Sequence, residues 1–241
     1  MNVPQYIQKF RKLPHVVRQL AHNGAYAVNE ELFWDQYVKD WESSGRNTSQ
    51  KYLGTEWKYE EDFLSLLQKY SSPEKDALEI GCGGGRITAA GVKLFKHVHA
   101  ADVSEEMLRK AKEAIAVGNV SFHKLDGFTL SDFTDESIDY VYSHDVFIQL
   151  SSIQVYPYLR EVKRVLRMGG IGLISFYDLV SQFELFKQWS LKFWDERKLP
   201  IYRRIHFVTE DMLRAMLADL RLDVFELQNR RFLTVAFRKA G

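Results

Sequence analysis

The chain has 241 residues, 46% of them hydrophobic, and its 33 basic residues nearly balance 32 acidic ones. This length and apolar content predict one α/β domain with appendages, and the formal charge of +1 excludes an overall electrostatic footprint for nucleic acid. No apolar run approaches the roughly 18 residues of a membrane span, and the single cysteine excludes an intrachain disulfide. We therefore expect a cytoplasmic protein with no membrane partner.

Residues 1–50 predict a helical N-terminal extension that a polar linker separates from the rest. Apolar residues recur at helical spacing over 6–20 and again over 29–41. The run 43–49 reads Ser-Ser-Gly-Arg-Asn-Thr-Ser, a composition typical of a linker. We therefore expect the extension at 1–50 and the main domain at 51–241.

The main domain opens with an amphipathic helix and a strand. Apolar side chains repeat at helical spacing over 60–70, and Ser71-Ser72-Pro73 is a helix stop. A short apolar run at 76–80 predicts the first strand. A glycine cluster follows it and leads into a predicted helix over 87–95.

Strands and helices then alternate, which favours a parallel sheet with helices on both faces. Ser104 is a predicted N-cap, Pro157 is expected in or near the first turn of its helix, and Met168-Gly169-Gly170 is expected to end that helix. The further strands are predicted over 97–102, 120–125, 138–143 and 171–177, and the helices between them over 104–115 and 152–166.

After the fifth strand, residues 178–206 break the alternation with an insertion crowded with aromatic side chains. Thr209 then opens a predicted helix over 212–220, and 222–227 with 232–237 predict a closing hairpin. The fold class that follows is α/β, with a doubly wound, mostly parallel sheet of seven strands.

The glycine cluster after the first strand is where the sequence predicts a ligand. In the run 79–86, Glu-Ile-Gly-Cys-Gly-Gly-Gly-Arg, the glycines allow the backbone to bend tightly and to approach a small molecule. A dinucleotide fingerprint would need glycine where Arg86 stands, and no Walker loop is present. The carboxylate of Glu79 would repel a pyrophosphate, so it favours a ligand with a cationic part.

The motif Glu79-x-Gly81-x-Gly83-x-Gly85 resembles the signature of class I S-adenosylmethionine-dependent methyltransferases. The resemblance runs from about Asp76 to Tyr177. Within it, residues 161–170 are similar to the family's E-x-x-R-V-L-x-P-G-G stretch, with Met168 where proline is usual. The resemblance implies a Rossmann-like fold, S-adenosylmethionine as cofactor and methyl transfer as the reaction.

The resemblance also implies a cofactor site at the ends of successive strands. Asp102 would accept hydrogen bonds from a ribose diol, with helix capping as the alternative. Asp126 would accept from the adenine amine, with a turn aspartate as the alternative. The predicted cofactor-binding residues are Glu79, Gly81, Cys82, Gly83, Gly85, Arg86, Asp102, Val103, Met107, Asp126, Gly127, Phe128, Ser143, His144 and Trp57.

His144, after the fourth strand, is the first candidate for a general base, because imidazole titrates near neutrality. Contact with cofactor or substrate without proton transfer is the alternative, and Asp145 could orient His144, contact the cofactor or cap the next segment. Arg86 opposes the dipole of the following helix, so we expect it to have a carboxylate partner or to contact the cofactor's carboxylate. Cys82 is interpreted as a small side chain that fits the turn and not as a nucleophile.

Several residues outside the glycine loop are candidates for a substrate lid, with core packing as the alternative: Tyr26, Tyr177, Trp189 and His206. His97 and His99 share one strand face, but no further ligands with metal spacing accompany them, so we predict no metal.

The sequence thus predicts an S-adenosylmethionine-dependent methyltransferase that acts on a small-molecule acceptor. The extension at 1–50 and the insertion at 178–206 would form a lid over its pocket. Two alternatives stay open, a methyltransferase acting on protein or RNA and an S-adenosylmethionine-binding protein without methyl transfer. The sequence indicates neither the acceptor atom nor an oligomeric state.

Overall fold

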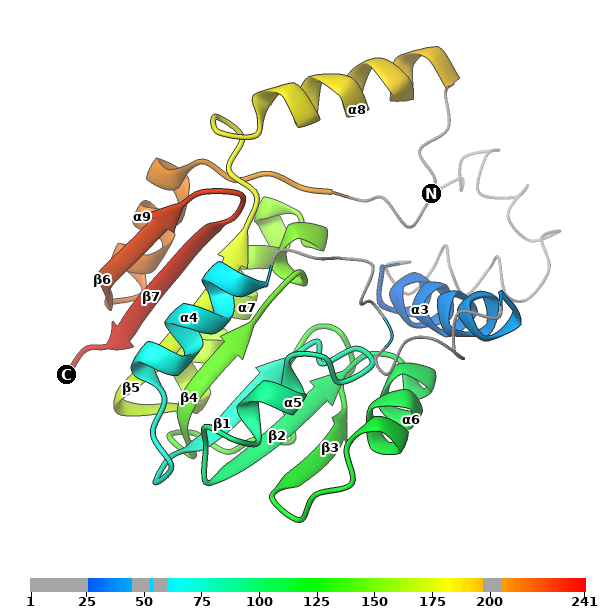
Figure 1. The fold of residues 1–241 in the computed structure, drawn as a ribbon. Coiled ribbons are helices and arrows are strands. Elements are labelled where there is room, and N and C mark those ends of the chain that lie inside the picture. The colour runs from blue at the N-terminus through cyan, green and yellow to red at the C-terminus, as the bar shows by residue number, and fades with distance from the viewer. Residues whose placement is uncertain (1–25, 45–52, 54–59, 197–204) are drawn as a thin grey trace, which may run out of the picture.

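The computed structural model describes residues 26–44, 53, 60–196 and 205–241. The predicted helix over 6–20, most of the linker and Trp57 lie outside these residues. At the centre is a seven-stranded sheet with the order β3-β2-β1-β4-β5-β7-β6 (Figure 1). The strands are β1 (Asp76–Ile80), β2 (His97–Asp102), β3 (Val120–Lys124), β4 (Ile138–Ser143), β5 (Leu166–Phe176), β6 (Leu222–Asn229) and β7 (Leu233–Lys239).

The direction in which the chain crosses the sheet reverses at β1. The first five strands are parallel, whereas β7 runs antiparallel to both β5 and β6. The doubly wound, mostly parallel sheet of seven strands is therefore confirmed. Because β2 and β4 flank β1 on opposite sides, the loops that follow β1 and β4 leave a crevice between them at the carboxyl edge.

Helices cover both faces of the sheet. In Figure 1, α4 and α5 lie on the near face and α7 and α9 behind it. The helices are α3 (Tyr26–Ser43), α4 (Glu61–Tyr70), α5 (Thr88–Gly91), α6 (Glu105–Ala114), α7 (Ser152–Val165), α8 (Phe183–Glu196) and α9 (Glu210–Asp219), with a short 3-10 helix η2 (Phe147–Gln149).

Two apolar cores result, because successive strand residues point to opposite faces. On one face, Phe63 of α4 packs in the same cluster as Tyr140 and Tyr142 of β4. On the other, Val141 of β4 joins Leu159 of α7. Each of these side chains is nearly or fully buried, and burying one contributes roughly 1.5–3 kcal/mol.

Three local expectations were wrong. The helix predicted over 87–95 is shorter in the structure, where α5 ends at Gly91; a Cβ at this glycine would be 2.3 Å from the phenol oxygen of Tyr142. Pro157 lies inside α7 and not near its first turn. Proline has no backbone N–H, so the helical hydrogen bond to the carbonyl of Ile153 is missing, and Ile153 is 85% exposed and open to water. The run 168–170 does not end α7 but belongs to β5, where Gly169 has a φ of +73°.

The predicted caps are confirmed. Ser104 Oγ accepts from the backbone N–H of Met107 at the start of α6, and Thr209 caps α9 in the same way. The aromatic insertion forms α8, which extends away from the rest of the molecule (Figure 1). In the described part of the chain, no helix has the length and apolar character that would let it cross a bilayer.

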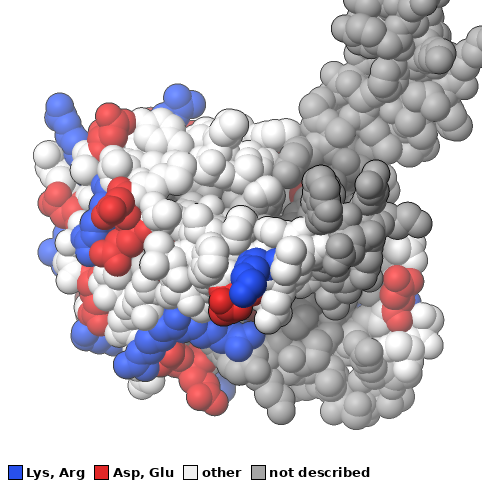
Figure 2. Space-filling view, turned by 90° about the horizontal axis from the view of Figure 1, so that it is seen from above, with Lys and Arg blue, Asp and Glu red and all other residues white. Residues whose placement is uncertain are grey.

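The described surface carries mixed charge. Figure 2 shows Lys and Arg residues beside Asp and Glu residues, with no broad area of one sign on the described part of that face. Arg109 of α6, for example, pairs with Glu106, Glu113 and Glu42.

Candidate active site

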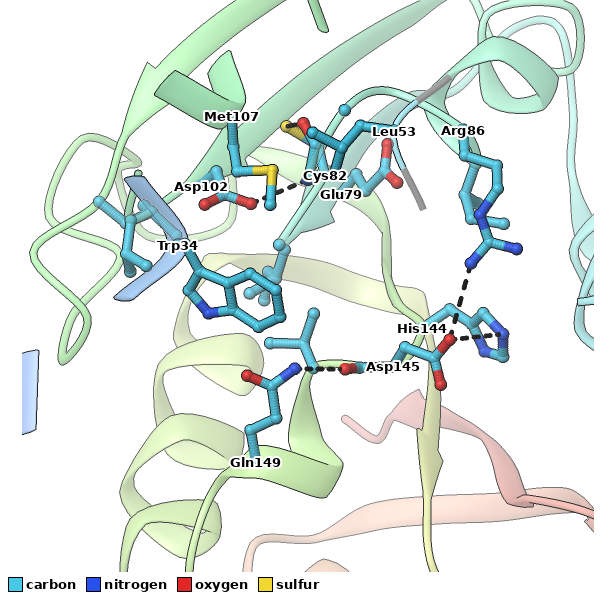
Figure 3. A pocket seen from close by; sticks show the side chains of 18 of the residues that line it. Trp34, Leu53, Glu79, Cys82, Arg86, Asp102, Met107, His144, Asp145 and Gln149 are labelled. Carbon is cyan, nitrogen blue, oxygen red and sulfur yellow. Dashed lines mark hydrogen bonds and ion pairs between the residues drawn. The ribbon is translucent and has the colours of Figure 1, made fainter. Parts of the chain in front are cut away.

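An elongated cleft lies over the carboxyl ends of β1, β2 and β4 (Figure 3). It consists of two cavities, one beside the glycine turn after β1 and the other beside the loop after β3. The cavities share a wall formed by Trp34, Val103, Val146, Gln149 and Tyr158. The two cavities are therefore adjacent.

The glycine turn forms the floor of the first cavity. Gly81, Gly83 and Gly85 all have positive φ, at 75°, 51° and 87°. A Cβ at Gly81 would meet Val146 at 2.2 Å, and one at Gly85 would meet Ile115 at 2.8 Å, so both positions are packed against protein. A Cβ at Gly83 would have no atom of the described residues within 4 Å. Gly83 is thus the position in the turn where backbone faces open space.

Asp102 links this turn to the end of β2. Its Oδ2 accepts from the backbone N–H of Gly83 at 2.8 Å, and its Oδ1 accepts from that of Ser104 at 2.9 Å. The side chain lines the cleft, and its burial raises the pKa of the carboxyl. Asp102 therefore supports the helix start and also faces the cavity.

Glu79 is a buried carboxyl at the base of the first cavity. It is 3% exposed, and Oη of Tyr142 donates to its Oε2 at 3.2 Å. Burial raises the pKa of Glu79 to about 8. A cation in the cavity would favour the ionised form of this carboxyl.

Most of the predicted cofactor residues line the cleft. Cys82 is among them; it is 5% exposed, and burial raises the pKa of its thiol, which fits a small packing residue better than a nucleophile. The first cavity is lined by Glu79, Gly81, Cys82, Gly83, Arg86, Asp102, Val103, Met107 and His144, and the second by Val103, Gly127 and Phe128.

Of the predicted cofactor residues that the structure describes, three do not line either cavity. Gly85 packs against α6, and Ser143 Oγ donates to the carbonyl of Ile80 at 2.8 Å, which joins β4 to β1. Asp126 accepts three hydrogen bonds from its own loop, two from backbone N–H groups of Phe128 and Thr129 and one from the Thr129 hydroxyl. The structure thus favours the turn-aspartate interpretation of Asp126 over contact with adenine.

None of the predicted substrate residues is among the described residues that line the cleft. Tyr177 is buried and stacks against Phe232 and Phe207, with ring centroids 5.1 and 5.9 Å apart, so core packing accounts for it. The backbone N–H of His206 donates to the carbonyl of Ile148 at 2.7 Å. Trp189 lies on α8, and Tyr26 begins α3, where its side chain is outside the described residues.

The sequence analysis missed several residues that line the cleft, among them Trp34, Leu53, Gln149 and Tyr158. Trp34 comes from α3, which packs on α6 rather than on the sheet. The Oδ1 of Asp35 accepts from the Ser104 hydroxyl at 2.6 Å, and Glu42 pairs with Lys110 at 2.6 Å. These contacts hold the Trp34 ring over the cleft.

His144 is held as a neutral ring at the far side of the cleft. It stacks on Phe63 at 4.5 Å, and its Nδ1 lies 3.0 Å from Ser175 Oγ. Burial, with the nearby charge of Arg86, lowers the pKa of His144 to about 3. An imidazole with that pKa is a weak base near neutral pH, which argues against the predicted general-base role.

Asp145 lies next to His144 in the left-handed region, with a φ of 63°. Burial raises the pKa of this carboxyl to about 6. Its Oδ2 lies 3.6 Å from Nη2 of Arg86, whose Nη1 donates to Glu60 (Figure 3 shows the Asp145 contact). Arg86 thus has the carboxylate partners that its place in the sequence led us to expect.

A histidine cluster lies on β2 and β3. Nδ1 of His99 is 3.0 Å from Nε2 of His123, and Ser121 Oγ lies 3.1 Å from each of them. His97 Nε2 is 2.9 Å from the same hydroxyl. Within the described ranges, no group of three or more His, Cys, Asp or Glu residues is arranged to hold a metal ion.

The fold is that of class I methyltransferases. A SAM-dependent methyltransferase of Methanosarcina mazei superposes with a TM-score of 0.59 over 73% of this chain and 97% of its own, at 19% identity. Residues 78–174 match a family model described as a methyltransferase domain, and this part of the chain belongs to that family. The predicted resemblance is confirmed.

Two curated relatives have different named acceptors. A phosphoethanolamine N-methyltransferase of Triticum aestivum is 27% identical over 63% of this chain, and a malonyl-[acyl-carrier protein] O-methyltransferase of Bacillus cereus is 32% identical over 57%. The aligned regions span 31% and 54% of those proteins. One name specifies N-methylation and the other O-methylation, so they leave the acceptor of this chain open.

Proposed function

We propose that this chain binds S-adenosylmethionine in the cleft and transfers its methyl group to a small-molecule acceptor. The observation that carries the proposal is the pairing of Gly83 with Asp102. Gly83 presents open backbone at the carboxyl end of β1, and the carboxylate of Asp102 faces the same cavity from the end of β2. Ligands of open α/β sheets bind at this crevice.

The residues around the cleft suit the parts of that cofactor. Asp102 would accept from the ribose hydroxyls, and the carboxyl of Glu79 would offset the positive charge of the ligand. Val103, Gly127 and Phe128 provide an apolar slot in the second cavity that suits a flat adenine ring. When bound, the cofactor would supply a methyl carbon that is already activated by its sulfonium, and the protein would mainly align the acceptor and exclude water.

A small acceptor is favoured because α3 covers the cleft. Trp34 lines both cavities, and the polar contacts of Asp35 and Glu42 fix the helix on α6. A protein or RNA acceptor would need an open groove, and for RNA a basic surface; the described face in Figure 2 carries mixed charges. The cytoplasmic location inferred from cysteine usage stays a prediction.

Titration calorimetry with S-adenosylmethionine and S-adenosylhomocysteine tests the binding. We expect micromolar binding by the wild type and a loss of at least about tenfold for Asp102→Asn. Asp223→Asn, an exposed aspartate on β6, is the matched control and should bind as the wild type does. Absence of binding at millimolar ligand would refute the proposal.

A further inference from the structure

The contacts of Ser175 bear on which His144 tautomer is present. The backbone N–H of Asp145 donates to Ser175 Oγ at 3.1 Å, and the same oxygen lies 3.0 Å from Nδ1 of His144. The hydroxyl hydrogen of Ser175 can donate to Nδ1 while its oxygen accepts from Asp145. In that arrangement the His144 proton is on Nε2.

The other ring nitrogen of His144 supports the same assignment. Its Nε2 lies 3.7 Å from Oδ2 of Asp145, just beyond hydrogen-bond distance (Figure 3). With the proton on Nε2, the N–H dipole points at the carboxylate and stabilises its charge. The alternative tautomer would direct a nitrogen lone pair at a carboxylate oxygen, which is repulsive.

Asp145 is therefore held from several sides and yet stays open to the cleft. Ser175 fixes its N–H, the Gln149 amide donates to its carbonyl at 2.9 Å, and Arg86 faces its carboxylate. The side chain remains 23% exposed and lines the first cavity. A non-glycine residue kept at positive φ by its surroundings is a common feature of functional sites.

We propose that Asp145, and not His144, meets the methyl acceptor and receives its proton, while Ser175 and His144 act as positioning residues for this carboxylate. The inference rests on the proposed methyltransferase function. It limits the acceptor to compounds whose nucleophilic group carries a proton. Such a group is an amine or a hydroxyl. A carboxylate acceptor has no proton to give, and the charge of Asp145 would repel it.

The reaction step balances as follows. The N–H or O–H bond of the acceptor breaks, and its proton moves to an oxygen of Asp145. The electron pair stays on the acceptor atom, which uses a lone pair to form the new bond to the methyl carbon. The pair of the broken carbon–sulfur bond goes to sulfur, which leaves as a neutral thioether.

The charged and titratable groups around Asp145 come from four parts of the chain. Arg86 follows β1, Glu60 precedes α4, Arg231 lies between β6 and β7, and Tyr177 follows β5. Arginines lower the pKa of the Asp145 carboxyl and Glu60 raises it, whereas burial is the largest influence and raises it. Among the groups around Asp145, His144 is the one whose ring nitrogen is recorded 3.7 Å from its Oδ2.

The tautomer can be tested on the protein alone. Nitrogen-15 spectra of histidine-labelled protein, with the His144 signal assigned by its loss in His144→Gln, should show a proton on Nε2 and none on Nδ1. A signal from the opposite tautomer would overturn the positioning role. This measurement needs neither cofactor nor acceptor, so its outcome is independent of the proposed function.

The acceptor class is tested by label transfer from methyl-tritiated S-adenosylmethionine into a small-molecule cell extract. We expect products whose label survives mild alkali, as N-methyl and ether groups do, and at least a hundredfold slower transfer by Asp145→Asn. Asparagine tolerates positive φ, so this variant should fold and bind S-adenosylmethionine as the wild type does. Asp223→Asn is the control with unchanged transfer.

Label that becomes volatile in alkali would indicate methyl esters and would overturn the inference. Transfer by Asp145→Asn at the wild-type rate would also overturn it. So would the absence of transfer by a wild-type protein that binds the cofactor. Failure of cofactor binding itself would instead refute the proposed function.

The role of His144 is tested by the pH dependence of methyl transfer, in an extract that contains an acceptor. His144→Phe should move the acidic limb of the pH–rate profile to higher pH, because the carboxylate of Asp145 loses a stabilising N–H. His144→Gln, which can restore a donor, should move it back.

Discussion

Gly83 combines a left-handed backbone with open space on its Cβ side, whereas the other positive-φ glycines of the turn lie against protein atoms. A side chain here would strain the backbone and would project into the cavity proposed for the cofactor. A non-glycine residue in this region costs roughly 1–2 kcal/mol. The effect on binding should therefore exceed the effect on stability.

We predict that Gly83→Ala lowers the affinity for S-adenosylmethionine by at least about tenfold and the free energy of unfolding by only about 1–2 kcal/mol. Calorimetry and urea unfolding measure the two. Gly118→Ala is a suitable control, because Gly118 does not have a positive φ and a Cβ there would meet no atom of the described part of the chain within 4 Å. Equal affinities for Gly83→Ala and wild type would show that the ligand does not approach this backbone.

We expect Glu79 to couple binding of a cationic ligand to proton release. Its pKa is about 8 in the folded protein against 4.5 in the unfolded chain, so the folded state holds the proton between these values. Stability attributable to this group is therefore greatest at low pH and falls as pH rises from about 4.5 to 8. A cationic ligand reverses the preference by stabilising the carboxylate.

We predict the release of up to about 0.9 proton per bound S-adenosylmethionine at pH 7. Calorimetry in two buffers of different ionisation enthalpy measures this number, and the affinity should rise between pH 6.5 and 8. Glu79→Gln should abolish the release. A wild type that binds with no proton exchange at pH 7 would show that Glu79 stays protonated beside the ligand.

At the scale of elements, α3 packs on α6 through an apolar cluster and through polar contacts. Val38 and Trp41 of α3 are buried in one cluster with Met107 of α6. Asp35 accepts from Ser104 and from the N–H of Glu106, so it acts as a second cap for that helix. Negative charge at a helix N-terminus is stabilising. The same contact places Trp34 on the cleft, so docking of α3 and ligand binding should be coupled.

We predict that Asp35→Asn weakens docking by on the order of 1 kcal/mol. Amide exchange over 30–43 should become several-fold faster, and affinity for S-adenosylmethionine should fall by a similar factor. Asp40→Asn is the matched control, because Asp40 is exposed and its carboxylate accepts from Gln36 of the same helix. Unchanged exchange in Asp35→Asn would mean that apolar packing alone holds α3.

Elements whose signals are local could be predicted from the sequence. The strand at 76–80, the Ser104 cap and the closing hairpin each have their cause within a few neighbouring residues. The close approach of Gly91 to Tyr142 could not be predicted, because these two residues are far apart in the chain.

The same distinction applies to the site. The glycine turn and Asp102 carry a recognisable spacing, whereas Trp34 and Gln149 reach the cleft only through tertiary docking. His144 lines the cleft, as predicted, but its burial lowers the pKa of the imidazole and disfavours the predicted general-base role. The sequence does not show how far a side chain is removed from water.

At the scale of the whole molecule, the histidine cluster makes stability depend on pH. Burial, with repulsion from its neighbours, lowers the pKa of His99 to about 4 from 6.5, and the pKa of His123 is also lowered. The unfolded chain therefore binds more protons than the folded protein between these values. The stability from the uncharged cluster is fully present above pH 6.5 and is lost as pH falls toward 4.

We predict a decrease in the free energy of unfolding of on the order of 1–2 kcal/mol between pH 7 and 5 from this cluster, a figure reduced for its partial exposure. Urea unfolding at several pH values measures the slope. His99→Asn should flatten it, whereas His206→Asn, on the loop before α9, should leave it unchanged. Parallel slopes in wild type and His99→Asn would contradict the prediction.

Cys82 is the only thiol in the chain, and it is buried beside Gly83 in the turn proposed to receive the cofactor. Its rate of alkylation therefore records how often this turn opens, with no label or mutation introduced. The native protein should react slowly with maleimide, and a molecule lodged above the turn should slow the reaction further. The chain thus contains its own reporter for screening candidate ligands.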